Sequence, residues 1–100
     1  VGMDDVVFEL DAELWVAESM DPWVFVTLPA DIGDEVRELA GPPRGFGSVR
    51  VEVTVGSTTW RTSVFPDKAR RYVLPVKKAV RRAESLEVGD STRLRLVVLG

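Results

Sequence analysis

The sequence of 100 residues contains no cysteine and no histidine. Without cysteine there is no disulfide, no thiolate nucleophile and no Cys-based zinc site. Without histidine, the Ser-His-Asp and Cys-His catalytic arrangements are excluded, together with the side chain that most often transfers protons near neutral pH. The remaining chemistry would depend on carboxylates, Lys, Tyr or Ser, or on a metal held by oxygen ligands, and no spacing signature for these is present.

Long apolar runs are also missing, because no stretch approaches the roughly 18 to 20 residues that cross a bilayer. Residues 1–5 have neither the basic nor the apolar region of a signal peptide. We therefore expect a cytoplasmic protein with no membrane partner. Hydrophobic residues at 45% and charged residues at 29% are ordinary values for a globular protein. We expect residues 1–100 to form a single domain.

The stretch from Gly45 to Pro66 predicts a β-hairpin. Valine occupies every second position from residue 49 to residue 55, which is typical of a strand with one buried face. Gly56-Ser57 follows, and a glycine there can take the positive φ of a tight turn. With two turn residues, Val53 lies opposite Trp60 and Glu52 lies beside Arg61. The same register pairs Val55 with Thr58, Val51 with Thr62, and Val49 with Val64.

Two further segments alternate between apolar and charged side chains and are predicted to pair. Val6–Val16 is expected to be a strand with an acidic exposed face, and Ser91–Leu99 a strand with Arg93 and Arg95 on its exposed face. We expect these arginines to lie beside the acids of the first strand. Those acids are Glu9, Asp11 and Glu13.

The remaining elements are an apolar strand, a short strand and two helices. Trp23–Leu28 is continuously apolar, so it should be covered on both faces, with the first helix over Trp23 or Phe25. That helix is predicted from about Ile32 to Ala40, with Asp31 as its N-cap and Gly41-Pro42-Pro43 ending it. A short strand at Tyr72–Leu74 leads into a second helix from Pro75 to Ala83, with Pro75 at its first position.

No strand-helix-strand repeat long enough for a parallel sheet is present, so the sheet should be antiparallel. The predicted fold class is mainly β, an antiparallel barrel of five or six strands with two short helices as caps.

Three stretches support a family resemblance: Trp23–Pro29 ahead of an acidic helix, Gly45–Val49 leading to Trp60–Pro66, and Leu74–Ala83 with Gly89-Asp90. Together they resemble the small bacterial family called domain of unknown function 1905, over roughly Phe8 to Leu99. The resemblance implies a split β-barrel with helical caps, similar in shape to the barrels of AbrB-type transcription regulators. It implies no established activity.

Charge is distributed unevenly along the chain. Residues 1–50 carry a net charge of −8 and residues 51–100 a net charge of +5. The stretch from Lys68 to Arg82 holds seven of the thirteen cations. A solvated helix face is the simpler interpretation, and an anion-binding face is the alternative. The candidate anion-binding residues are Lys77, Lys78, Arg81, Arg82, Arg70 and Arg71.

Aromatic side chains could line a ligand pocket, but a barrel of five or six strands is filled by its own side chains, so we expect them in the core. They are Trp15, Trp23, Phe46, Trp60, Phe65 and Tyr72. Trp15 is the exception, because it lies on the outward side of its strand with Glu13. This placement suggests a partner surface or cover by a loop.

These observations favour a non-catalytic module that binds a protein or a small anionic ligand through the surface around the second helix. We expect no cofactor, no metal, and a monomer or weak homodimer. An AbrB-like nucleic-acid-binding regulator is the alternative, although the acidic net charge of −3 is unusual for DNA binding. A carboxylate-based enzyme is the third possibility.

Overall fold

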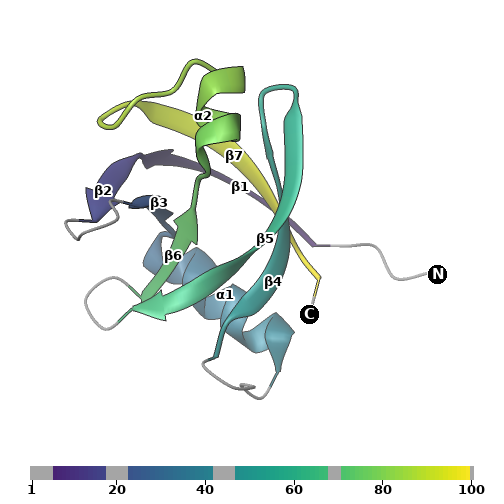
Figure 1. Cartoon of the computed structure of the whole chain (residues 1–100). Coiled ribbons are helices and arrows are strands. Elements are labelled where there is room, and N and C mark those ends of the chain that lie inside the picture. The colour runs from purple at the N-terminus through teal and green to yellow at the C-terminus, as the bar shows by residue number, and fades with distance from the viewer. Residues whose placement is uncertain (1–5, 18–22, 42–46, 68–70, 100) are drawn as a thin grey trace.

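A computed structural model describes residues 6–17, 23–41, 47–67 and 71–99, and Arg71 through its backbone only. Within these residues, seven antiparallel strands form one sheet in the order β1-β7-β4-β5-β6-β3-β2, accompanied by two short helices. The sheet curls into a half-barrel, with α1 and α2 at opposite ends (Figure 1). The predicted fold class is confirmed. The elements are β1 (Val7–Glu13), β2 (Trp15–Ala17), β3 (Trp23–Thr27), α1 (Ala30–Ala40), β4 (Val49–Val55), β5 (Thr58–Asp67), β6 (Arg71–Pro75), α2 (Lys78–Ala83) and β7 (Ser91–Val98).

The β4–β5 hairpin has the predicted register. Val53 pairs with Trp60 and Glu52 pairs with Arg61, whose Nε lies 3.2 Å from a carboxylate oxygen of Glu52. Gly56 has a φ of +58° in the turn, as a tight hairpin requires. The alternate valines of β4 face the core and are almost fully buried. The two-residue turn sets the register of the hairpin, and the alternate valines of β4 determine which of its faces forms the core.

Leu14 divides the first predicted strand into β1 and β2. Its N–H donates to the carbonyl of Asp90 at 2.9 Å, its carbonyl accepts from the N–H of Gly89 at 2.8 Å, and its side chain is fully buried. Because β1 and β2 are the two edges of the sheet, the chain passes at Leu14 directly from one edge to the other. The single strand expected over Val6–Val16 is thus two, and the described sheet has seven strands rather than five or six.

The predicted pairing of the first and last strands is confirmed. Arg93 lies 3.6 Å from Asp11 and Arg95 lies 3.8 Å from Glu9. Both pairs are exposed, so each contributes little to stability. Two of the three acids of β1 are therefore accounted for by the neighbouring strand, whereas Glu13 lies opposite Ser91.

Strand β3 is buried on its inner face and only partly covered on its outer face, where Phe25 is half-buried, so the expected cover by the first helix is wrong. Val24 and Val26 point into the core, whereas Trp23 points outward with 58% of its surface exposed. Helix α1 packs against the core through the buried Val36 and does not cover Trp23. Of the other aromatic residues expected in the core, Trp60 and Tyr72 are buried, Phe65 is 41% exposed, and Phe46 lies outside the described residues.

Both helices begin at a different residue from the one predicted. Pro29 is the N-cap of α1 and its carbonyl accepts the N–H of Gly33 at 2.8 Å, so Asp31 lies inside the first turn. Helix α2 begins at Lys78, because Pro75 is the last residue of β6. The N–H of Val76 donates to the carbonyl of Val24 at 2.9 Å, and this bond keeps the chain extended past Pro75.

Candidate functional site

Strands β5 and β6 separate along part of their length. They pair at only three positions, from Phe65 opposite Val73 to Asp67 opposite Arg71. On the N-terminal side of Phe65, β5 extends back to the hairpin turn, while the chain after β6 enters α2 (Figure 1). We call the space between β5 and the Pro75–Arg81 segment the seam. At its far end, Glu84 accepts a hydrogen bond from Thr58 Oγ1 at 2.5 Å and joins α2 to the hairpin.

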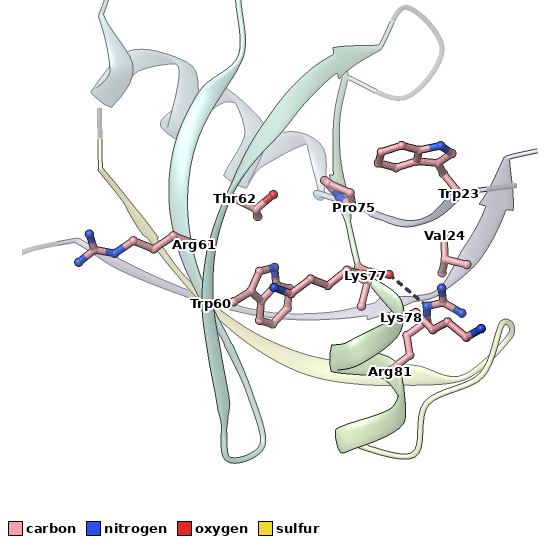
Figure 2. Close-up of a pocket in the computed structure, with 10 residues that line it drawn as sticks. Trp23, Val24, Trp60, Arg61, Thr62, Pro75, Lys77, Lys78 and Arg81 are labelled. Atoms are coloured by element: carbon pink, nitrogen blue, oxygen red, sulfur yellow. Dashed lines mark hydrogen bonds between the residues drawn. The ribbon is translucent and has the colours of Figure 1, made fainter. Parts of the chain in front are cut away.

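A pocket of about 300 Å³ lies in the seam. Its walls come from three parts of the chain: Trp60 and Thr62 of β5, Val24 of β3, and the segment from Pro75 to Arg81 at the end of β6 and the start of α2 (Figure 2). This volume is at the lower end of the range for small-molecule sites. The pocket lies between the two places where these segments are joined, the β5–β6 ladder and the hydrogen bond of Thr58 to Glu84.

Three cations line the pocket on the side of α2. They are Lys77, Lys78 and Arg81. Lys77 extends toward Trp60 across the opening, and Arg81 folds back so that its Nε donates to the carbonyl of Val76 at 3.1 Å (Figure 2). Across the described part of the chain, these three cations form no ion pair and no carboxylate lines the pocket. Arg61 also lines it, but Arg61 is paired with Glu52 and points away (Figure 2).

Trp60 provides a further donor. Its side chain is 9% exposed, and its indole N–H donates no hydrogen bond within the described residues. Because no buried side-chain nitrogen or oxygen in that part of the chain lacks a partner, this N–H must reach solvent. Trp60 lines the pocket, which makes this N–H a candidate donor to a ligand there.

The comparison with known protein families identifies the chain. The family model described as Domain of unknown function (DUF1905) matches residues 10–96, which include every pocket residue. The chain belongs to this family. No curated protein matches the sequence.

The DUF1905 domain brings together three of the six candidate anion-binding residues, namely Lys77, Lys78 and Arg81. Arg82 instead lines a neighbouring groove, which it shares with Lys78, Arg81 and the acidic Glu87. Arg71 begins β6, at the end of the strand away from the pocket. Arg70 lies outside the described residues.

Trp15 lies on the outer face of the domain and is half-buried. Its ring centroid is 5.3 Å from that of Phe25, and its Nε1 donates to Thr27 Oγ1 at 2.9 Å. Strand β3 thus covers part of the side chain that we considered for a partner surface. Trp15 does not line the seam pocket.

Sequence reasoning considered Trp23 and Trp60 for a ligand pocket but favoured the core for both, whereas both line the seam pocket. The alternation along β5 correctly places Trp60 on the inner face, but no local signal shows that β5 and β6 separate beside it. One clue to this separation is the Pro75-Val76-Lys77 segment. It divides the run of cations into those near the start of β6 and those of α2.

Neither a metal site nor a membrane span is found in the structure as described. Over residues 6–17, 23–41, 47–67 and 71–99, acidic side chains do not gather in a group that could hold a metal ion. In the same ranges no helix is long and apolar enough to cross a membrane.

Proposed function

We propose that the seam pocket of this DUF1905 domain binds a small anionic ligand and that the domain is a binding module rather than an enzyme. The observation that carries this proposal is the set of three cations around one pocket that form no ion pair with any described residue, Lys77, Lys78 and Arg81. Like charges one helical turn apart repel each other by a few tenths of a kcal/mol. A bound anion would offset this repulsion, because it attracts each of the cations.

The hydrogen-bonding character of the pocket supports an anion more specifically. The lysine and arginine side chains and the indole N–H of Trp60 are donors only, and the hydroxyl of Thr62 can also donate. A ligand rich in acceptors, such as a phosphate or carboxylate, complements such a lining through charge-assisted hydrogen bonds. The lack of histidine and cysteine supports binding over catalysis.

Calorimetric titration with ribose 5-phosphate at low salt tests the proposal. Lys77→Gln should weaken binding roughly fivefold to tenfold, because it removes one partly exposed charge-assisted contact. Arg82→Gln is the matched control: it removes the same charge from the same segment but does not line the pocket, so it should change affinity less than about twofold. Absence of binding by the unmodified protein would overturn the proposal.

A short DNA duplex distinguishes the nucleic-acid alternative. Arg82, Lys78 and Arg81 together line the groove beside the pocket, so a duplex bound across α2 would use both surfaces. If the duplex binds more tightly than ribose 5-phosphate, and Arg82→Gln weakens it as much as Lys77→Gln does, the AbrB-like function is favoured. A steep loss of duplex binding with added salt would agree with that outcome.

A cytoplasmic location and a monomeric or weakly dimeric state are also part of the proposal. Cell fractionation tests the first and light scattering over a concentration series tests the second.

A further inference from the structure

Trp23 is placed beside the cations of the pocket by the β3–β6 ladder. Phe25 pairs with Pro75, and the hydrogen bond from the N–H of Val76 to the carbonyl of Val24 continues the same register by one step. One more step in this register would bring Trp23 opposite Lys77, and both residues line the pocket. Since side chains alternate along a strand, Trp23 lies on the same outer face as Phe25. The lining of one pocket therefore combines an aromatic residue at the start of β3 with the cations at the start of α2 (Figure 2).

Among the described residues, the indole of Trp23 is supported by Phe25. It stacks on Phe25, with ring centroids 6.3 Å apart and an interplanar angle of 17°, and Phe25 in turn packs on Trp15. This stack restricts the orientation of the indole, although 58% of the Trp23 surface is exposed. A large aromatic side chain held in place at the edge of a pocket is ready to stack on a planar ligand, with little further ordering needed.

We propose, building on the function proposed above, that the ligand carries a planar aromatic group next to its anionic group, as a nucleoside monophosphate does. The aromatic group stacks on the exposed part of Trp23, and the phosphate contacts Lys77 and the other two cations. The N–H of Trp60 donates to an acceptor deeper in the pocket. Stacking on an aromatic side chain is tolerant of base identity, so the structure selects this class rather than one base.

Three probes separate the parts of this ligand: adenosine monophosphate, ribose 5-phosphate, which lacks the base, and adenosine, which lacks the phosphate. Calorimetry on the unmodified domain should give roughly tenfold tighter binding of adenosine monophosphate than of ribose 5-phosphate, from the stacking contribution of one base. Adenosine should bind more weakly than adenosine monophosphate, and added salt should reduce this difference.

Trp23→Leu should remove the advantage of adenosine monophosphate over ribose 5-phosphate and leave the affinity for ribose 5-phosphate unchanged. Phe65→Leu is the matched control, because Phe65 is another exposed aromatic residue of the barrel and does not line the pocket. It should preserve both affinities. Thermal unfolding of both variants checks that each is folded.

Two results would overturn the proposed stacking of an aromatic group on Trp23 and leave the proposed anion binding intact. One is equal affinity of the unmodified domain for adenosine monophosphate and ribose 5-phosphate. The other is a Trp23→Leu variant that is folded but weakens both probes equally, since Trp23 would then shape the pocket without stacking. Failure of both phosphates to bind would instead refute the proposed function itself.

Discussion

Replacing Glu84 with alanine should loosen the contact between α2 and the β4–β5 hairpin turn. The Glu84 carboxylate accepts hydrogen bonds from Thr58 Oγ1 at 2.5 Å and from Ser57 Oγ at 3.4 Å. These residues are 26 and 27 positions away in the sequence, so the contact is tertiary. It closes the end of the seam that the β5–β6 ladder does not reach.

The bond from Thr58 should dominate the effect of the Glu84→Ala substitution on the free energy of unfolding. It is short and half-buried, whereas the contact with Ser57 is long and exposed. A hydrogen bond to a charged group contributes about 1.5 to 3 kcal/mol, and partial exposure puts this one at the lower end. Removing a carboxylate from the C-terminal end of α2 recovers about 0.3 kcal/mol. We expect a net loss of about 1 kcal/mol, or about 4 to 8 °C in Tm.

Urea unfolding followed by tryptophan fluorescence measures this loss. Glu87→Ala is the control, because it removes the same charge three residues later from an exposed side chain that makes no hydrogen bond among the described residues. A double-mutant cycle with Thr58→Val should give a coupling of about 1 kcal/mol with Glu84→Ala. Equal destabilisation by Glu84→Ala and Glu87→Ala, or zero coupling to Thr58, would refute the reasoning.

Two further substitutions test the fold by the same urea measurement. Leu14→Ala should cost about 2 to 5 kcal/mol, because it empties a fully buried site where the sheet edges meet, against less than about 0.5 kcal/mol for the half-exposed Leu39→Ala. Similar costs would contradict the role of Leu14. Gly56→Ala should cost about 2 kcal/mol, because the residue has a φ of +58° and a Cβ there would displace the Glu84 carboxylate. This cost should fall to about 1 kcal/mol in the Glu84→Ala background, and an unchanged cost would show that the carboxylate is not displaced.

Local patterns in the sequence were sufficient to predict the hairpin and the pairing of the outer strands. The register of β4 and β5 follows from the turn at Gly56 and from a side-chain period of two, both of which are local. The pairing of Arg93 with Asp11 follows from charge complementarity between two strands that each have one exposed face. In both cases the sequence contains the whole physical reason.

Features that depend on the separation of distant segments were not predicted. Pro75 is compatible with the first turn of a helix, but the hydrogen bond between Val76 and Val24, which are 52 positions apart, keeps it in β6. Trp23 lies in an apolar run that resembles a strand buried on both faces. Only the tertiary arrangement shows that the indole stacks on Phe25 and remains exposed. The seam pocket depends on both of these long-range features. The sequence therefore indicated the cations of the pocket but not the strands and the helix that form its walls.

The most direct test of the anion-binding pocket is a 15N-HSQC titration of the full chain with ribose 5-phosphate at low salt. The chain has three tryptophans, so their three indole N–H signals report on separate places. The account predicts shifts of the Trp60 indole and of the Lys77 and Lys78 amides. The Trp15 indole, which donates to Thr27, should not move. A spectrum without shifts, or one in which the Trp15 indole moves as much as the Trp60 indole, would contradict it.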